Sequence, residues 1–239
     1  MKPTPSLESS PTRDPGKVVP LLAPRSPDAT GVRVRRATSR ADLEQAAALR
    51  YRAHRHHGTA WASQVQHPEA ADADPQVHVL LAECKSDGTP LGTVRLHRNH
   101  HSPLPLEAFV QLPTRWQGRR LLEAERLAVP PHASLAGAAR DALFKACFLH
   151  ALEHDIQAIL VTARPAVARI YEGLLFEDVF EARTMVSMPF AGNLPHRVLG
   201  LWLAEAPSRW LARNHPMLGF MLAGLKDLGP GAADARLAA

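Results

Sequence analysis

The order in which strand-like and helix-like patterns follow one another most constrains how this chain can fold. Helical spacing of apolar residues marks three stretches, at 40–57, 134–154 and 165–176. Apolar stretches that alternate or are rich in β-branched residues indicate strands at 32–38, 77–84, 91–98, 121–129, 157–164 and 179–190. The resulting order β-α-β-β-β-α-β-α-β predicts an α/β domain over residues 32–190, with a mixed sheet flanked by helices.

Two local signals support this order. Ser39 is followed three residues later by Asp42, which resembles a capping box at the start of the first helix, and Gly58 is suited to end that helix. Asp87 and Gly88 form a turn signal between the second and third strands. These strands are therefore expected to form a hairpin.

The two flanks of this domain differ from it in composition. Residues 1–31 contain seven prolines and no periodic pattern, which predicts a disordered tail. Residues 191–239 are apolar but are interrupted by Pro207 and Pro216, which predicts a C-terminal extension of short helices. Such helices can cover the core, form a lid over an acyl pocket, or make a peripheral contact with a membrane surface.

Composition excludes several classes of protein. The formal net charge is +5, yet aromatic and basic residues are not interleaved, so no nucleic-acid partner is expected. Neither a signal-peptide core nor an apolar run long enough to span a bilayer is found, which predicts a cytoplasmic protein.

The potential metal ligands are numerous but show no recognised motif. Cys84 and Cys147 are far apart in apolar contexts, which indicates reduced thiols rather than a disulfide framework or a CxxC motif. Histidines gather near the end of the first helix and after the hairpin, at His54, His56, His57, His97, His100 and His101. No cysteine accompanies them, so no metal site is predicted.

Residues 121–129, LLEAERLAV, place three charged side chains inside an otherwise apolar strand. Burying a charge is costly unless it is paired or used. On a regular strand Glu123 and Glu125 share one face and Arg126 points to the other, whereas a β-bulge would bring Glu123 and Arg126 closer. The stretch therefore predicts either a charged cluster that faces a cleft or a structural ion pair between Glu123 and Arg126.

The order of elements resembles the GNAT acyltransferase superfamily, in which a central strand precedes a long helix, a strand and a short helix that contains a tyrosine. VTARPAVARIYEGLLF, at 161–176, looks like the second half of that pattern. The resemblance covers residues 32–190 and departs from the usual motif at Leu175, where a glycine normally precedes the phenylalanine. It implies the GNAT fold and an acyl transfer reaction.

A second departure concerns the donor. Superfamily members that use coenzyme A usually carry a Gln/Arg-x-x-Gly-x-Gly/Ala loop after the central strand, whose backbone N–H groups face the pyrophosphate. Here Gly137 and Ala139 match the small positions of this cofactor loop, but Ser134 stands at its leading position. The resemblance therefore implies a weak phosphate cradle.

A narrower subset of the superfamily fits the sequence better. LuxI-type acyl-homoserine lactone synthases and FeeM-type N-acyl amino acid synthases take acyl chains from acyl carrier protein. They share an Arg on the first helix, acidic residues before the hairpin, an Arg on its second strand and Glu-x-x-Arg on the central strand. In the same order this sequence carries Arg50, Glu69, Asp72, Asp74, Arg95, Glu123 and Arg126.

The resemblance implies roles for these residues in N-acylation. Glu123 would accept the proton of the attacking amine or orient that amine. Asp72 and Asp74 would bind a positively charged amino group, and Arg95 and Arg126 would neutralise them or clamp a substrate carboxylate. Substrate binding is further assigned to two residues, Arg50 and Tyr171, the latter also as an acid toward the leaving thiolate.

Each candidate also has a structural interpretation. Asp72 and Asp74 can cap backbone groups of an Ala/Asp/Pro loop. Arg95 is suited to the surface of a hairpin, Glu125 to solvent, and Tyr171 to a core in which its hydroxyl is satisfied. The series of charged residues in register favours the functional interpretation over these alternatives.

Three functions are compatible with the sequence. The first is transfer of a fatty acyl group from acyl carrier protein to the amine of a small molecule such as an amino acid. It needs no bound cofactor, because the acyl group arrives on acyl carrier protein or on coenzyme A as a co-substrate. The second is acetyl-CoA-dependent N-acetylation with a degenerate loop. The third is a catalytically inactive GNAT-like protein used for binding or regulation.

Overall fold

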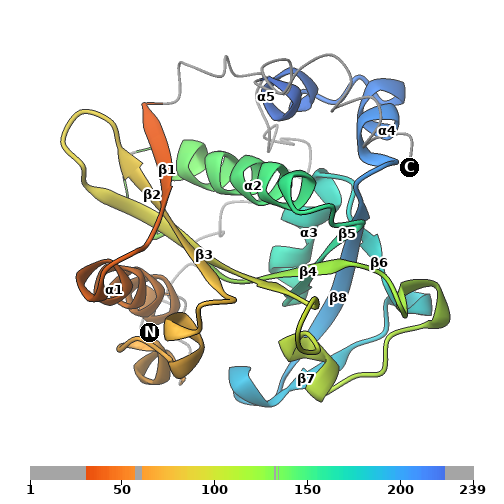
Figure 1. The fold of residues 1–239 in the computed structure, drawn as a ribbon, viewed down its shortest axis with the longest axis horizontal. Coiled ribbons are helices and arrows are strands. Elements are labelled where there is room, and N and C mark those ends of the chain that lie inside the picture. The colour runs from red at the N-terminus through yellow and green to blue at the C-terminus, as the bar shows by residue number, and fades with distance from the viewer. Residues whose placement is uncertain (1–30, 57–60, 132, 134, 224–239) are drawn as a thin grey trace, which may run out of the picture.

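The computed structural model describes residues 31–56, 61–131, 133 and 135–223. The predicted tail, apart from Gly31, lies outside these residues, as does the helix end expected at Gly58. The described strands form a mixed sheet in the order β1-β2-β3-β4-β5-β8-β6, with β7 also paired to β8 (Figure 1). Their bounds are β1 Val32–Arg36, β2 His78–Cys84, β3 Pro90–Arg98, β4 Leu121–Ala128, β5 Ala158–Ala163, β6 Glu177–Asp178, β7 Val186–Met188 and β8 Leu194–Trp202.

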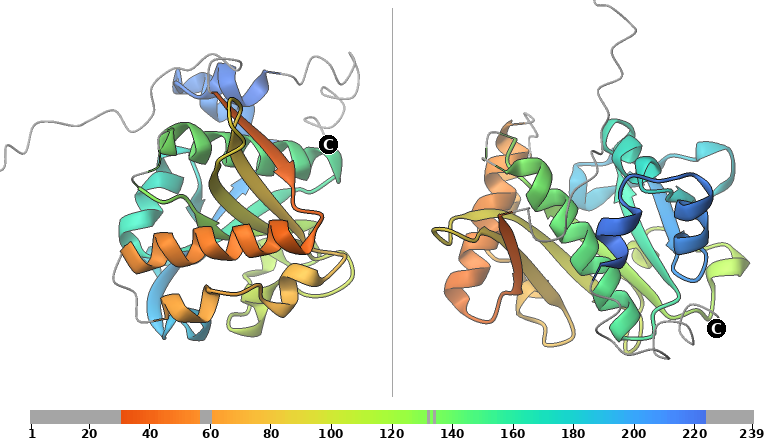
Figure 2. Two further views of the ribbon diagram at one scale, coloured as in Figure 1. Left: turned by 90° about the vertical axis from the view of Figure 1, so that its left-hand side faces the viewer. Right: turned by 90° about the horizontal axis from the view of Figure 1, so that it is seen from above.

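Helices cover both faces of this sheet, as Figures 1 and 2 show. One face carries α1 and several 3-10 helices, whose apolar side chains form two core clusters with the strands. The other face carries α2 and the helices that follow it, which share one large core cluster. The helices are α1 Arg40–His56, α2 Ala136–Glu153, α3 Pro165–Gly173, α4 Ala206–Ala212 and α5 Leu218–Leu222. The predicted α/β class is thus confirmed.

The two faces can be read directly from the residue alternation of β4. Leu122 and Ala124 belong to the core cluster under α2, whereas Leu121 belongs to the cluster on the opposite face. Glu123 and Glu125 share the parity of Leu121 and therefore point to the α1 side of the sheet. The charged strand thus has one apolar face and one face that carries its two carboxyl groups.

Two local predictions are confirmed in detail. The Asp42 N–H donates to Ser39 Oγ at 3.1 Å and the Ser39 N–H donates to Asp42 Oδ2 at 3.0 Å, which is the reciprocal capping box at the start of α1. β2 and β3 pair antiparallel around a short turn, as the hairpin signal indicated. Local hydrogen bonding was therefore sufficient to place these two features.

The C-terminal part of the chain differs from the prediction. Residues 179–190, expected to form one strand, contain only the short strand β7, preceded by the 3-10 helix Glu181–Arg183. Residues 191–239, expected to form a helical extension, contain the nine-residue strand β8 near their start. Residues 197–202 of β8 pair antiparallel with the whole of β5. The sheet therefore extends past the boundary expected at residue 190, because β8 supplies the partner that β5 needs on its second edge.

The short helices predicted after this strand are present as α4 and α5. Trp210, Phe220 and Met221 are buried in the core cluster under α2, and the Trp210 ring lies 5.3 Å from that of Phe148. These helices thus cover the core, which is the first of the expected roles. Among the described helices, none combines the length and the apolar character that crossing a bilayer requires.

Candidate active site

The candidate site lies where β4 and β5 separate. These parallel strands pair only over Leu121–Glu123 and Ala158–Leu160. Beyond that pairing a cleft of about 360 Å³ opens between them, at the carboxyl ends where open α/β sheets bind ligands. The residues in its walls come from α1, β4, α2, β5, α3, β8 and the segments between them. They include the charged or titratable residues Glu125, Arg126, Arg140, Arg164, Tyr171 and His196.

Arg126 interrupts the regular course of β4 at the edge of this cleft. Its φ of 54° lies in the left-handed region, which is uncommon for a residue other than glycine. The pairing with β3 also shifts its register here, between the pairs Thr93–Ala128 and Arg95–Glu125. This is a β-bulge, as the sequence suggested, and it turns the Arg126 side chain into the cleft beside Glu125.

Charged side chains from four segments meet on this face of the sheet, and we call them the charged cluster. One comes from α1, two from the segment around the 3-10 helix Ala70–Ala73, one from β3 and two from β4. Three guanidinium groups face three carboxylates, so the formal charges balance. The members are Arg50, Glu69, Asp72, Arg95, Glu125 and Arg126.

Asp72 anchors the charged cluster at its buried end. Its carboxylate accepts hydrogen bonds from both terminal nitrogens of Arg50, at 2.7 and 2.9 Å, and from Nη1 of Arg95 at 3.1 Å. The side chains of Asp72 and Arg50 have no exposed surface. Burial alone would raise the pKa of Asp72, but Arg50 holds it below its usual value. This pair supports the site from behind rather than contacting a substrate.

Arg95 links the buried end of the charged cluster to the cleft. Its Nε donates to Glu125 at 2.8 Å and its Nη1 donates to Glu69 at 3.0 Å as well as to Asp72. His97, two residues along β3, places Nε2 2.6 Å from Glu125 Oε1, a close contact without the angle of an aligned hydrogen bond. Arg95 is thus fully engaged by protein carboxylates and is not a surface residue of the hairpin.

Arg126 and Glu69 form the end of the charged cluster that borders the cleft. The Nε and Nη2 atoms of Arg126 donate to the two oxygens of Glu69 at 2.9 and 2.6 Å, a bidentate pair. The guanidinium carbon also lies 5.9 Å from the ring centre of Trp61 and 5.1 Å from that of Phe190. These contacts fix the plane of the guanidinium. The ion pair expected between Glu123 and Arg126 is replaced by this pair with Glu69.

Glu125 and Glu123 have opposite electrostatic environments although they share one face of β4. Burial would raise the pKa of Glu125, but His97, Arg95 and Arg126 outweigh it and lower that pKa to about 2. Burial raises the pKa of Glu123 to about 8, with a further contribution from the negative charge of Glu125. Oε2 of Glu123 accepts the Leu106 N–H at 2.9 Å, and Oε1 has no hydrogen-bond partner among the described residues. At neutral pH Glu125 is ionised and Glu123 is mostly protonated.

Other predicted residues lie outside the charged cluster. Asp74 is exposed and accepts the Gln76 N–H at 2.8 Å, which is the loop-capping alternative. Gly137, in the first turn of α2, lines the cleft, whereas Ala139 is buried in the core under that helix. Tyr171 lines the cleft from α3 and packs its ring against Phe144 and Phe176, and burial raises the pKa of its hydroxyl.

Three residues of the site were not assigned a function from the sequence. Glu69 belonged to the series in register but was given no role, and Glu125 was expected to face solvent although only 8 % of its surface is exposed. His196 on β8 lines the cleft and is buried, and its strand was not predicted. The sequence did contain a signal for Glu125, because residues 123 and 125 of a regular strand point to the same face of the sheet.

The comparisons with known proteins agree with this geometry. The family model of the N-acyl amino acid synthase FeeM matches residues 45–192, which include the whole charged cluster and the apolar strand that carries it. The chain belongs to the FeeM family of N-acyl amino acid synthases. No curated protein matches the sequence.

Solved structures place the FeeM-family chain among the GNAT folds. FeeM from uncultured soil microbes is 17 % identical, with a TM-score of 0.59 over 77 % of this chain and 97 % of that one. Apo TofI is 13 % identical, with a TM-score of 0.53 over 74 % and 94 %. The predicted resemblance to FeeM-type N-acyl amino acid synthases is confirmed by the family match, and the protein is an N-acyltransferase. The likeness to FeeM and TofI confirms the predicted fold.

Proposed function

We propose that this FeeM-family enzyme transfers a fatty acyl group from acyl carrier protein to the amine of an amino acid. The observation that carries the proposal is that one wall of the cleft presents an ionised carboxylate and a guanidinium side by side. Glu125 matches the ammonium group of a free amino acid, and Arg126, which keeps Nη1 outside its bidentate pair with Glu69, matches the carboxylate.

An apolar wall opposite these charges supports a long acyl chain. Ala124, Leu127 and Tyr171 line both the cleft and a narrow apolar cavity of about 20 Å³ behind it. That cavity continues between the sheet and α2 toward Trp210 and Met221. An acyl chain would enter it by displacing flexible side chains, of which Met221 is the most adaptable.

Two arginines favour a phosphate-bearing, acidic donor. Arg140 in the first turns of α2 and Arg164 just before α3 line the cleft together with Gly137. The phosphopantetheine arm of acyl carrier protein carries one phosphate, and the carrier itself is strongly acidic, so a mouth bordered by guanidinium groups matches both. A coenzyme A donor would use the same mouth and is an outcome of the test below.

The proton of the attacking amine is best assigned to His196. The Leu194 carbonyl can only accept, so the contact of 2.8 Å with Nδ1 fixes the proton on Nδ1 and leaves Nε2 as the basic atom. Burial lowers the pKa of His196, which keeps the ring neutral at pH 7. Glu123, the base expected from the sequence, does not line the cleft and holds its own proton.

The reaction then proceeds by addition and elimination. The ammonium group of the bound acceptor first releases one proton to solvent at the open cleft. The neutral amine then attacks the thioester carbon, a C–N bond forms, and His196 takes the second proton that the nitrogen loses. The C–S bond breaks as the carbonyl re-forms, and the leaving thiolate accepts a hydrogen bond from the Tyr171 hydroxyl and takes its proton from solvent. Burial raises the pKa of Tyr171, so this hydroxyl stays protonated as a hydrogen-bond donor. Holding both substrates in one cleft supplies the attack geometry.

Mass spectrometry of the products tests this function. The full chain is incubated with long-chain acyl carrier protein or with acetyl-CoA, each with a pool of amino acids. An N-acyl amino acid formed from the carrier supports the proposal and names the acceptor. Acetylated product from acetyl-CoA alone would replace it with N-acetylation, and no product from either donor by folded protein would contradict both.

One variant tests the role of His196. His196→Asn keeps a donor for the Leu194 carbonyl but removes the base, so kcat should fall about 100-fold while the KM for the donor stays the same. The acidic limb of the pH profile of kcat/KM should disappear with it. An unchanged pH profile would assign the proton to another group.

Two further properties remain proposals. A cytoplasmic location is supported by the thiols, since Cys84 and Cys147 are both free. A peripheral membrane contact through the C-terminal segment has little support among the described residues, where exposed Leu211 on α4 is the main apolar side chain that such a contact could use.

A further inference from the structure

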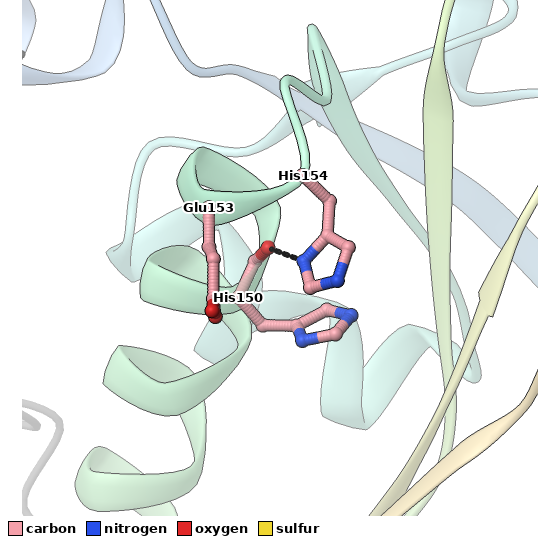
Figure 3. Close-up of side chains that lie close together, drawn as sticks. All are labelled: His150, Glu153 and His154. Carbon is pink, nitrogen blue, oxygen red and sulfur yellow. Dashed lines mark hydrogen bonds between the residues drawn. The ribbon is translucent and has the colours of Figure 1, made fainter.

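A second polar cluster lies on the opposite face of the sheet from the charged cluster. It consists of His78 at the start of β2 and three residues from the last turn of α2, His150, Glu153 and His154, and we call it the histidine cluster. Figure 3 shows the three helix residues gathered at the end of α2. His78 shares the parity of Leu80 and Ala82, which pack under α2, so its ring points toward this helix end.

The rings of the histidine cluster are in contact with one another. The ring centres of His150 and His154, four residues apart on one helix face, are 4.1 Å apart, and that of His78 lies 4.7 Å from His150 and 6.0 Å from His154. One ligand atom each from His150, Glu153 and His154 lies within 4.8 Å of the others. These side chains converge from two elements that are far apart in the sequence.

A hydrogen bond orients the ring of His154 as metal ligands are oriented. Nδ1 of His154 donates to the His150 carbonyl oxygen at 2.9 Å (Figure 3), which leaves Nε2 of His154 with a lone pair available for a ligand. Metal-binding histidines characteristically donate their second ring N–H to a backbone carbonyl in this way. Nε2 of His150 is buried and has no hydrogen-bond partner among the described residues, so the folded chain leaves a polar atom unsatisfied at the centre of the cluster.

Charged groups also surround the histidine cluster. The guanidinium groups of Arg36 and Arg98 act on both His78 and His150. The carboxylate of Glu153 is the negative group that offsets the two guanidinium charges.

We propose that the histidine cluster binds a zinc ion through His78, His150 and His154, with Glu153 as the fourth ligand. Three imidazoles and one carboxylate form a set that suits tetrahedral Zn²⁺. Zinc–ligand bonds of about 2.1 Å place ligand atoms about 3.4 Å apart, so the side chains would close in by rotation about their χ angles. The ion would tie the start of β2 to the end of α2, which is a structural role outside the acyl transfer site.

The test uses the full chain without an affinity tag, after treatment with a chelator and dialysis. Zinc at about 100 times its Kd should raise Tm by about 5–10 °C. His150→Asn/His154→Asn should abolish this rise, and His78→Asn should weaken it. The matched control is His100→Asn/His101→Asn, an exposed pair of neighbouring histidines whose removal should leave the rise unchanged.

A second measurement does not depend on the variants folding. Cobalt(II) added to the native chain should give the intense visible absorption of a tetrahedral site, and one equivalent of zinc should remove it. The proposal is overturned if zinc leaves Tm unchanged, if the His150/His154 variant retains the full rise, or if cobalt shows only the weak absorption of the hydrated ion.

Discussion

The two halves of β4 show how one strand can supply both a scaffold and a reactive surface. Over Leu121–Glu123 the strand pairs with β3 on one side and β5 on the other, and its carboxyl group is buried away from the cleft. Past Glu123 the pairing with β5 ends, the bulge at Arg126 follows, and Glu125 and Arg126 line the cleft. The boundary between the halves is the end of the parallel pairing.

The contrast between Glu123 and Glu125 shows that partners, rather than burial, set the charge. Both side chains are almost fully buried, yet the pKa of one is raised and that of the other is lowered. Three cationic or potentially cationic groups surround Glu125, whereas Glu123 has one backbone N–H as its hydrogen-bond donor. A buried carboxyl group without a cation is most stable when protonated.

The largest effect on stability is expected when the charged cluster loses a guanidinium group. Arg95→Met removes the donor shared by Glu125, Glu69 and Asp72, and should reduce the free energy of unfolding by about 3–5 kcal/mol. The buried Glu125 loses its guanidinium hydrogen bond, whereas Glu69 and Asp72 keep Arg126 and Arg50 as partners. Urea denaturation at pH 7 measures this change. Arg40→Met, at an exposed ion pair on α1, is the control and should cost less than about 0.5 kcal/mol. Equal losses would show that the cluster contributes no more than a surface pair.

Glu125→Gln should have the next largest effect on stability, about 1.5–3 kcal/mol at pH 7. The pKa of Glu125 is lowered from 4.5 to about 2 in the folded protein, so its stabilising contribution is present above pH 4.5 and is lost as the pH falls toward 2. The difference from the wild type should therefore shrink in acid. A difference that stays constant from pH 7 to pH 3 would contradict the lowered pKa.

A smaller effect on stability is expected at the end of the charged cluster that borders the cleft. Arg126→Lys keeps the positive charge but replaces the bidentate pair with Glu69 by a single contact, at a cost of about 1 kcal/mol. If Arg126 also binds the acceptor carboxylate, the KM for the acceptor should rise about 10-fold while that for the donor is unchanged. Steady-state kinetics with each substrate varied in turn measures this, and a rise in the donor KM alone would contradict the role.

At pH 4.5 Glu123→Gln should have the smallest effect of these variants, and at higher pH its effect should have the opposite sign. The pKa of Glu123 is raised from 4.5 to about 8 in the folded protein, so the wild type loses stability as the pH rises from 4.5 to 8, whereas the variant has no such group. Stability at pH 4.5 should agree within about 0.5 kcal/mol, and the variant should be the more stable at pH 8. Unfolding curves at the two pH values measure this. A variant that is less stable at pH 8 would show that Glu123 is ionised and paired.

Much of the fold follows from local patterns in the sequence. Residues close together in the chain determine the hairpin β2–β3 and the capping box at Ser39. The bulge beside Arg126 follows from a run of charged and apolar residues that a regular strand cannot accommodate. The position of β8 depends on an unfilled edge of β5, which is a property of the assembled sheet. For that reason its nine residues were expected to belong to a helical segment.

The site was predictable in its members but less so in their roles. The series in register located the charged cluster, but whether a carboxylate faces a cleft or an arginine depends on distances that the sequence does not contain. Asp72 is therefore a buried anchor, and Asp74, two residues later, is an exposed loop cap. His150 and His154 are four residues apart in the sequence, which places them on one face of a helix. That His78 from β2 lies beside them is visible only in the structure.

The central claim is that the half of β4 beyond the pairing with β5 binds the acceptor amino acid in the cleft. It is tested most directly by measuring kcat/KM for acyl transfer from long-chain acyl carrier protein with Glu125→Gln and Glu123→Gln in parallel. We expect Glu125→Gln to lose about 100-fold or more and Glu123→Gln to stay within about threefold of the wild type. A large loss with Glu123→Gln and none with Glu125→Gln would contradict the account and return the catalytic base to the buried half of the strand.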